Sequence, residues 1–500
     1  MLATAHAACL IGIEANPVQV EVRLGEGLPG FDIVGLPERA VRESRIRVRA
    51  ALASIGFTFP PRNLVLNLAP GDVPKTGAGL DLAIAAAVLA ACEGVSTDLL
   101  PSTLLVGELS LSGELRPVRG VLALLRSARA AGLRNAVIPE GNRREAMLVE
   151  GVSVLSAAHV GAVVRWLNAD APLPDVTGDA PALRSDLDDE PDRDLAAIRG
   201  QEAARRALEI AAAGGHHMLL IGSPGAGKTM LARALPSILP PPSAEEALEI
   251  ATIASSAGLR SPRILTGRQR PFRAPHHTAS AAAIVGGGEP IRAGELTLAH
   301  RGVLFLDELP EFRRDAIETL RTTMEEGEVV ISRARQRVRL PAEPMVVAAM
   351  NPCPCGYHGD PTRYCRCGEL QIARYRGRVS GPLLDRFDLQ VAVPRVSARV
   401  MRKATPGEPS KAVQHRVEQA RARLTSSGTR GSLESLTLDV TQEALTLLEL
   451  GVERLKMSAR AYLKALCVAH TIAALSESSE VLPAHTAEAL QYRVLDREPT

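Results

Sequence analysis

The hydrophobic pattern changes in character along the chain. Between residues 195 and 394, short unbroken apolar runs alternate with segments in which apolar positions recur at helical spacing. This alternation predicts a parallel sheet flanked by helices. Three of the runs, MLLI, GVLFL and MVVAAM, are continuous enough to be buried strands of that sheet. After residue 411, leucine and alanine recur at helical spacing, which predicts an all-helical tail.

Polar stretches divide this pattern into parts. Residues 168–194 hold four prolines, nine acidic residues and two arginines without apolar periodicity, so we interpret them as a linker. The linker separates an N-terminal domain, residues 1–167, from a central domain, residues 195–395. A second polar stretch, KATPGEPSK at 403–411, lies near the start of a helical C-terminal domain, residues 396–500.

One segment, ISRARQRVRL, carries a basic residue at every second position. The four cations are Arg333, Arg335, Arg337 and Arg339. In an extended chain this spacing places all four on one face. Taken alone, the segment is equally well a solvated strand edge, where charge discourages aggregation.

The composition is that of an ordinary soluble globular protein, with 23% charged residues, 46% hydrophobic residues and a formal net charge of +2. Such a small net charge excludes a wholly basic nucleic-acid coat but allows a local basic channel. The longest apolar run, residues 82–92, is shorter than the ~18 residues that indicate a membrane span, so we expect no membrane partner. The first charged residue is Glu14, so the basic start of a secretory signal is missing and we expect a cytoplasmic protein.

The residues after the MLLI run match a phosphate-binding pattern. In HMLLIGSPGAGKTMLARAL a strand, a glycine-rich turn and a helix follow one another, and the turn fits G-x-x-x-x-G-K-[ST]. The glycines let backbone N–H groups close round phosphates, Lys228 reaches the outer oxygens, and the Thr229 hydroxyl can ligate Mg²⁺. The sequence therefore predicts an ATP-binding loop made of Gly222, Ser223, Pro224, Gly225, Ala226, Gly227, Lys228 and Thr229.

Polar side chains follow the other two runs. After GVLFL, Asp307 would hold Mg²⁺ through water, and Glu308 would orient or deprotonate the attacking water. A helix N-cap is the alternative for this pair, but the phosphate loop upstream favours catalysis, and hydrolysis over binding alone. After MVVAAM, the amide of Asn351 could position the lytic water, although an Asn-Pro pair is by itself a common turn.

Two arginines further along are candidates for the same site. Arg386 in SGPLLDRFDL could neutralise transition-state charge on a neighbouring subunit, which would require a ring. Arg460 in MSARAYLKAL is the candidate in the helical tail. Either arginine alone is more often a surface salt-bridge partner.

These stretches together resemble a known family. GSPGAGKT, FRAPHHTAS, GVLFLDELPEF, NPCPCG, SGPLLDRFDL and MSARAYLKAL are similar to AAA+ ATPases of the magnesium-chelatase-like branch over residues 195–500, and the whole chain resembles the ComM/YifB family. The resemblance implies an α/β AAA+ P-loop core with a C-terminal helical lid. It places Asn351 at the sensor-1 position, Arg386 at the arginine finger and Arg460 at the sensor-2 position. It also implies a hexameric ring that acts as a DNA helicase or translocase, associated with branch migration in natural transformation.

The resemblance gives the arginine segment a setting, because related ATPases project a β-hairpin at this point into a central pore. A ring would repeat Arg333, Arg335 and Arg337 around one axis. Such a channel would follow DNA phosphates without reading bases, and its binding would weaken steeply with salt. We therefore predict that these arginines contact single-stranded or branched DNA, with a solvated strand edge as the alternative.

The FRAPHHTAS segment precedes the carboxylate strand, and we interpret it as a second loop near the pore. Its adjacent His276 and His277 would face opposite ways in an extended chain. They would then make a poor shared metal site, so a structural or pore-loop role is favoured.

Four of the seven cysteines cluster in CPCGYHGDPTRYCRC. They form two pairs, Cys353 with Cys355 and Cys365 with Cys367. Four thiolates suit tetrahedral Zn²⁺ in number and softness. Because C-x-C spacing is less usual than C-x-x-C, free thiols or a redox pair stay open, and His358 could replace one thiolate. A zinc site here would brace the strand end at Asn351.

The N-terminal domain contains VGELSLSGELRPVRGVLALLRSARAAGLRNAVIP, which resembles the proteolytic domain of Lon-type proteases. Such a protease needs a serine nucleophile and a lysine base. Gly77 stands where the serine is expected, and Ala123 stands where the lysine is expected. We therefore interpret residues 1–167 as an α+β, Lon-protease-like scaffold that is not proteolytic and binds DNA or a partner.

Three functional hypotheses follow. The first is an ATP-driven DNA motor. The alternative is a chelatase-type AAA+ motor that remodels a protein partner, although no metal-chelatase integrin-like domain is recognisable in the sequence. The third is an ATP-dependent protease, and the missing serine and lysine argue against it.

Overall fold

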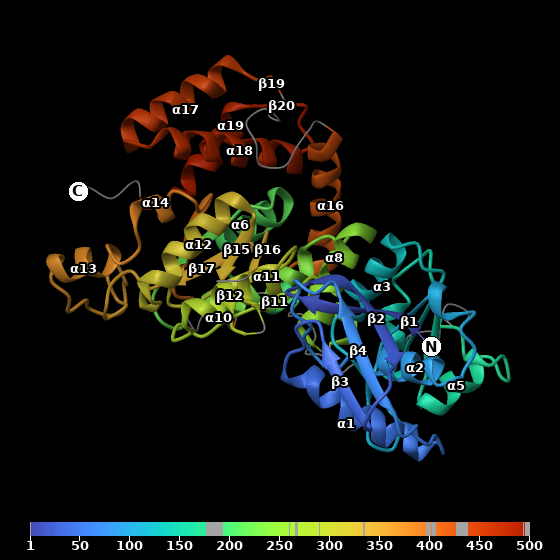
Figure 1. Cartoon of the computed structure of the whole chain (residues 1–500). Coiled ribbons are helices and arrows are strands. Elements are labelled where there is room, and N and C mark those ends of the chain that lie inside the picture. Colours follow the sequence, from blue (N-terminus) through green and yellow to red (C-terminus); the bar gives the residue numbers. More distant parts are fainter. Residues whose placement is uncertain are drawn as a thin grey trace.

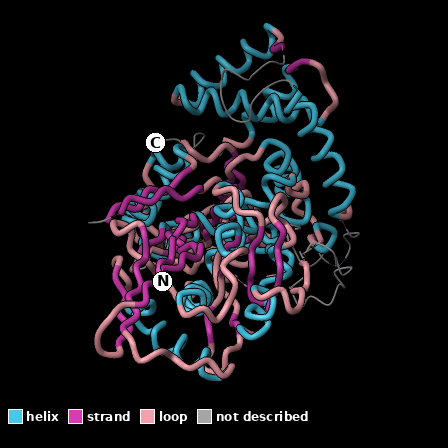
Figure 2. Tube along the Cα trace, turned by 45° about the vertical axis from the view of Figure 1, so that its right-hand side comes forward, coloured by secondary structure: helices cyan, strands magenta, loops and turns pink. Residues whose placement is uncertain are grey.

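In the computed structural model, the chain folds into three parts: an N-terminal part, a central part and a C-terminal part. Figure 1 shows an N-terminal sheet in blue and cyan beside a central sheet in green and yellow, with red C-terminal helices above, and Figure 2 shows the same arrangement after rotation. The description covers residues 2–176, 194–259, 261–265, 269–289, 291–333, 336–396, 402, 407–426, 439–493 and 495. Most of the predicted linker, residues 177–193, therefore lies outside it.

A seven-stranded mixed sheet forms the N-terminal part, in the order β3-β4-β2-β1-β5-β8-β9. Its long antiparallel pair β1–β2 buries alternate residues such as Val18, Val20 and Val22, as expected for strands with one covered face. Its strands are β1 (Leu2–Ile11), β2 (Glu14–Leu24), β3 (Gly30–Val34), β4 (Asn63–Ala69), β5 (Thr103–Leu105), β8 (Asn135–Pro139) and β9 (Ser153–Ala157). A separate short pair is β6 (Glu108–Leu109) and β7 (Leu115–Arg116).

Helices cover this sheet. The apolar run at residues 82–92 lies almost entirely in α2, and every residue of α2 is buried, which explains why the helix is apolar on all sides. The helices of this part are α1 (Arg39–Ser54), α2 (Asp81–Ala91), η1 (Leu100–Ser102), α3 (Val121–Ala130), η2 (Glu140–Asn142), α4 (Arg143–Ala146) and α5 (Val160–Leu167). Within the described residues, no helix is both long and apolar enough to cross a membrane.

The central part is built on a five-stranded sheet in the order β11-β14-β17-β10-β18, and all its pairings are parallel. Every residue of β10, β14 and β17 is buried, as in sheets covered on both faces. The prediction of a parallel sheet from the three apolar runs is therefore confirmed. The strands are β10 (Met218–Ile221), β11 (Phe272–Arg273), β14 (Val303–Leu306), β17 (Met345–Met350) and β18 (Leu389–Ala392).

Short helices and two hairpins connect these strands. The helices are η3 (Leu195–Ala197), α6 (Glu202–Gly214), α7 (Lys228–Ala234), η4 (Leu235–Ile238), α8 (Ala244–Ala257), α9 (Pro262–Leu265), α10 (Ala281–Val285), α11 (Glu295–Leu298), η5 (Leu309–Glu311), α12 (Arg314–Glu326), α13 (Glu369–Arg376) and α14 (Gly381–Leu384). The hairpins are β12 (Gly286–Gly287) with β13 (Arg292–Ala293), and β15 (Glu328–Arg333) with β16 (Gln336–Pro341).

The β15–β16 hairpin contains the arginine segment. The arginines do not share one strand, as they would in a fully extended chain: Arg333 ends β15, whereas Arg337 and Arg339 lie on β16, which begins at Gln336. Arg335 lies outside the described residues. On β16, Arg337 and Arg339 are exposed, and Arg339 pairs with Glu328 at 2.8 Å. The opposite face is apolar and packs on the central core through Val329, Ile331, Val338 and Leu340.

The C-terminal part is mainly helical. Its helix α18 packs against α6 of the central part, and Val468 and Ile472 share a buried cluster with Ala207 and Ala211. Its elements are α16 (Ser410–Ser426), α17 (Gln442–Leu455), α18 (Ala459–Leu475), α19 (Pro483–Gln491) and the two-residue strands β19 (Asp439–Val440) and β20 (Glu480–Val481).

The described residues of the N-terminal part contact the central part through several elements, including α3 and the turn between β1 and β2. The helix α3 packs along α8, and Gly120 donates its backbone N–H to the carbonyl of Ser255 at 3.0 Å. The turn between β1 and β2, residues 11–13, packs on the hairpin. A Cβ atom on Gly12 would lie 2.9 Å from Cγ1 of Val338 and 3.2 Å from Cδ2 of Leu340, so the turn packs closely on the apolar side chains of the hairpin. We call residues 11–13 the β1–β2 turn.

Candidate nucleotide-binding site

The carboxyl ends of β10, β14 and β17 meet at one edge of the central sheet, the place where α/β folds bind ligands. A cavity of about 640 Å³ opens there, and pockets of ~300–1,000 Å³ hold small-molecule ligands. It is lined by Pro224, Gly225, Ala226, Gly227, Lys228, Thr229, Met230, Arg233, Asp307, Glu308, Met350 and Asn351. Side chains predicted from three separate motifs therefore face one cavity.

The loop between β10 and α7 has the backbone that its glycines allow. Gly225 and Gly227 have φ values of +76° and +97°, in the left-handed region that glycine tolerates. Lys228 turns back over the loop and donates to the carbonyls of Gly222 at 2.6 Å and Ser223 at 3.2 Å. Burial lowers the pKa of Lys228, and the nearby carboxylates oppose this shift.

The ends of β14 and β17 supply oxygen and amide groups. Thr229 donates its hydroxyl to Asp307 Oδ2 at 2.8 Å, so two oxygen ligands of the kind Mg²⁺ prefers lie side by side. Lys228 Nζ donates to Asn351 Oδ1 at 3.1 Å, which joins the phosphate loop to the end of β17. The size of the cavity and these polar groups fit a nucleoside triphosphate with Mg²⁺.

Glu308 stands at the mouth of this cavity in a left-handed backbone conformation, with φ +55°. Its side chain is 52% exposed, and Oε2 lies 3.2 Å from Nδ1 of His277. The prediction that His276 and His277 face opposite ways is wrong. The chain turns at this point, so the two rings lie 4.2 Å apart and only His277 reaches the carboxylate.

Replacing His277 tests whether this contact restrains Glu308. We expect His277→Ala to raise the basal rate of ATP hydrolysis about fivefold, because it frees a carboxylate from an interaction of about 1 kcal/mol. The measurement is the steady-state rate with and without DNA. His276→Ala is the matched control, since its Nδ1 lies 2.9 Å from Thr278 instead. A fall in the basal rate of His277→Ala would contradict restraint and show that His277 aligns Glu308.

Arg386 and Arg460 lie together, and neither is among the residues that line the cavity. Glu325, near the end of α12, is paired with Arg386 and also accepts from Arg460 Nη2 at 2.7 Å. The two guanidinium groups hold the pKa of Glu325 below its usual range, Arg386 contributing most. Arg386 is only 5% exposed at its side chain, whereas Arg460 is 51% exposed.

The C-terminal helices hold the Arg386 segment. Lys464 of α18 donates to the carbonyl of Arg386 at 2.8 Å and to Asp388 at 2.6 Å. Ser458 donates to Asp385 at 3.2 Å. The position of Arg386 therefore depends on the placement of α18.

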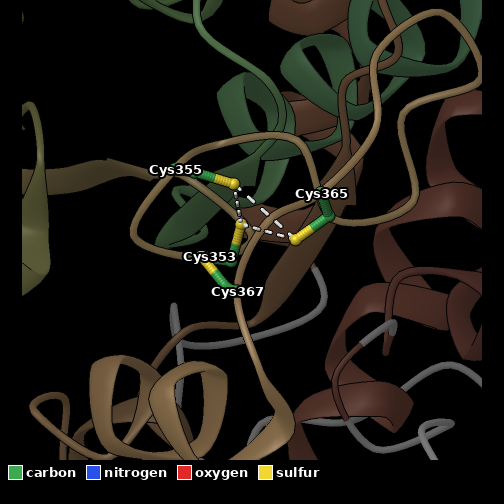
Figure 3. A group of neighbouring side chains, drawn as sticks. All are labelled: Cys353, Cys355, Cys365 and Cys367. Carbon is green, nitrogen blue, oxygen red and sulfur yellow. Dashed lines mark hydrogen bonds between the residues drawn. The ribbon is translucent and has the colours of Figure 1, made fainter.

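The four clustered cysteines come together in the loop after Asn351 (Figure 3). The Sγ atoms of Cys353, Cys355 and Cys365 lie 3.4–3.7 Å apart, and all four sulfurs, including Cys367, lie within 4.8 Å of one another. Backbone N–H groups, that of Arg366 foremost, lower the pKa of Cys355 to about 6. His358 does not belong to this group of possible metal ligands.

Sequence reasoning missed three contacts of this region. His277 reaches Glu308, Glu325 joins the two arginines, and Lys464 holds the Arg386 segment. His277 and Lys464 both belonged to motifs singled out in the sequence, FRAPHHTAS and MSARAYLKAL, but neither residue was given this contact. Glu325 has no local signal, because its contact is defined by residues far away along the chain.

Comparisons with known proteins place these features in a family. Three family models match: magnesium chelatase, subunit ChlI, over residues 194–401; subunit ChlI of Mg-chelatase over residues 20–142; and magnesium chelatase, subunit ChlI C-terminal, over residues 407–493. YifB of Escherichia coli (strain K12) is 42% identical over 99% of this chain and 98% of its own length. Competence protein ComM of Haemophilus influenzae is 40% identical over the same shares of the two chains. This chain belongs to the ComM/YifB family.

As a ComM/YifB protein, the chain carries an ATPase domain of the magnesium-chelatase type, and the family resemblance read from its motifs is confirmed. A weaker similarity links it to proteases. Lon protease 2 of Bacillus subtilis is 22% identical over 26% of this chain, and Lon protease of Methanosarcina barkeri is 28% identical over 27%. Gly77, with φ +79°, and the buried Ala123 provide neither a nucleophile nor a base.

Proposed function

We propose that this ComM/YifB protein is an ATP-hydrolysing motor that assembles as a hexameric ring and moves on DNA. Its work would be branch migration during homologous recombination or natural transformation. The observation that carries the proposal is the combination, in one subunit, of the nucleotide cavity and a hairpin with exposed arginines. The name of its relative, competence protein ComM, supports the same setting.

Each motif has a role in this proposal. The loop Gly222–Thr229 binds the phosphates of ATP, and Thr229 and Asp307 hold Mg²⁺, which shields phosphate charge. Glu308 takes the proton of the attacking water, and Asn351 orients that water. The residues of this loop that we propose bind the ATP phosphates are Gly222, Ser223, Pro224, Gly225, Ala226, Gly227, Lys228 and Thr229.

The ring completes the site. Arg386 and Arg460 are held by Glu325 and do not line the cavity of their own subunit, so we assign them to the nucleotide of a neighbouring subunit. Arg386 would act as the arginine finger, and Arg460 as the second sensor. The buried Nε of Arg386 has no hydrogen-bond partner among the described residues, which is consistent with an atom that finds its partner across an interface.

The cysteine cluster is a candidate site for a second metal ion. We propose that Cys353, Cys355, Cys365 and Cys367 hold a structural Zn²⁺ ion. Four Zn–S bonds of ~2.3 Å in a tetrahedron place sulfurs about 3.8 Å apart, whereas a disulfide needs about 2.05 Å. The observed separations of 3.4–3.7 Å fit the first arrangement.

DNA contact is assigned to Arg333, Arg335 and Arg337 on the hairpin, and the double variant Arg335→Ala/Arg337→Ala tests it. We expect DNA to stop stimulating hydrolysis in this variant while basal hydrolysis continues, because the phosphate contacts are lost. The measurement is the steady-state ATPase rate with single-stranded and branched DNA, at low and moderate salt. Stimulation in the wild type should fade as salt rises.

The control is Arg313→Ala, an exposed arginine paired with Asp315 at the start of α12. It should leave stimulation intact. Undiminished stimulation of the double variant would place DNA elsewhere on the protein. If no DNA stimulates the wild type, the chelatase-type alternative, a motor that remodels a protein partner, takes precedence.

A further inference from the structure

The cysteine loop, residues 352–368, touches the phosphate loop directly. The contact is made by Gly356, which is buried and has φ +85°. A Cβ atom at this position would lie 2.6 Å from Cδ of Pro224 and 3.8 Å from Cγ of Asn351. The turn that carries Cys353 and Cys355 therefore presses its backbone against the phosphate loop, with no room for a side chain.

Asp360 makes a second contact from the same loop. Its Oδ1 accepts from the backbone N–H of Thr362 at 2.8 Å, from the Thr362 hydroxyl at 2.7 Å and from the N–H of Arg363 at 3.2 Å. Its Oδ2 is buried and has no hydrogen-bond partner among the described residues. The neighbouring hydroxyl is that of Ser223, which after Thr362 contributes to holding the pKa of Asp360 well below its usual range. The Asp360 carboxylate thus lies beside Ser223 of the phosphate loop.

The cysteine loop has no helix or strand to hold its shape. No helix or strand is assigned between Asn351 and the start of α13 at Glu369. Half of its side chains are exposed, Tyr364 at 89%, so the loop has no hydrophobic core of its own. Besides local contacts, such as that of Arg363 with the Tyr357 hydroxyl at 2.7 Å, the gathered sulfurs join the two ends of the loop, and Gly356 and Asp360 lie between these ends in the sequence.

From these contacts we infer that the cysteine site, when filled by Zn²⁺, braces the phosphate loop and thereby sets the affinity for ATP. The inference rests on the proposed zinc site and does not depend on DNA. Zinc fixes the spacing of the two cysteine pairs, and this positions Gly356 against Pro224 and Asp360 beside Ser223. Without the metal the loop is free to open, and the phosphate loop loses its support on this side.

Metal exchange on the full-length protein is the first test. Zinc content is measured after purification, the protein is stripped with a chelator, and binding of a fluorescent ATP analogue is titrated after returning Mg²⁺ alone or Mg²⁺ with Zn²⁺. We expect the stripped protein with Mg²⁺ alone to bind about tenfold more weakly, and Zn²⁺ to restore binding. Equal affinities in both conditions would overturn the brace, and a protein that neither contains nor takes up zinc would overturn the metal site as well.

Two variants separate the metal from the contact that it supports. Cys365→Ser should lose zinc and bind the analogue about tenfold more weakly, whereas Asp360→Asn should keep zinc and weaken binding by a similar factor, as for loss of a charged hydrogen bond. Cys92→Ser, which changes a cysteine of the N-terminal part, should alter neither property. Wild-type affinity in Asp360→Asn would show that the cysteine loop does not act on the phosphate loop through this carboxylate. All titrations are made without DNA, so failure of the DNA motor proposal leaves their outcome unchanged.

Discussion

Glu308→Gln should reduce ATP hydrolysis by on the order of 10³-fold and leave ATP binding intact, because an amide cannot accept the proton of the attacking water. Glu308 is suited to this role by its position. It follows β14 directly, borders the cavity, and is half-exposed at the edge where substrate water arrives. The measurement pairs the basal hydrolysis rate with the dissociation constant of an ATP analogue.

The control for this variant is Glu311→Gln. Glu311 lies three residues further along, and its carboxylate pairs with Arg378 at 2.8 Å on the surface. Surface pairs of this kind contribute little, so hydrolysis should stay near the wild-type rate. Substantial hydrolysis by Glu308→Gln would mean that another group activates the water, and the assignment of the GVLFLDE motif would have to be revised.

Arg386→Ala should be inactive by itself, with a loss on the order of 10³-fold, because an arginine finger stabilises transition-state charge by about this factor. A mixture of Arg386→Ala and Glu308→Gln subunits should recover part of the rate. In a mixed ring, a subunit with an intact Glu308 can lie beside one with an intact Arg386, so a complete site forms between two inactive chains. The measurement is the hydrolysis rate of co-expressed, doubly tagged rings.

Recovery on mixing is specific to action between subunits. If Arg386 only stabilised its own chain through Glu325, two inactive chains would stay inactive when mixed, and this result would contradict the assignment. Glu325→Gln is the control, since it removes the same ion pair but keeps the guanidinium. We expect this variant to retain most of its activity, because Glu325 is itself exposed and a surface carboxylate contributes little to stability.

The sequence was informative where chemistry follows directly from a buried strand. The sequence was sufficient to predict that the ends of β10, β14 and β17 lie together, because parallel strands share a carboxyl edge. Contacts between side chains distant along the chain could not. Glu325 meets Arg386 and Arg460 only because α12, the segment after α14 and α18 pack at one place, and no periodicity encodes that meeting.

Local geometry limited the prediction in a second way. The alternation of arginines and the adjacent histidines were both interpreted as extended chain. Arg333 instead ends β15, whereas Arg337 and Arg339 lie on β16, its antiparallel partner, and the turn after His276 brings the two rings together. A change of chain direction takes few residues, yet it changes which side chains share a face.

The packing of the β1–β2 turn has a mechanical consequence. Gly12 lies against Val338 and Leu340 of the β15–β16 hairpin. If the hairpin moves during ATP hydrolysis, as the proposed motor requires, it must either carry the N-terminal sheet with it or break this contact. In the first case the N-terminal part would act as a lever, and a protein or DNA segment bound to its sheet would be displaced with each cycle.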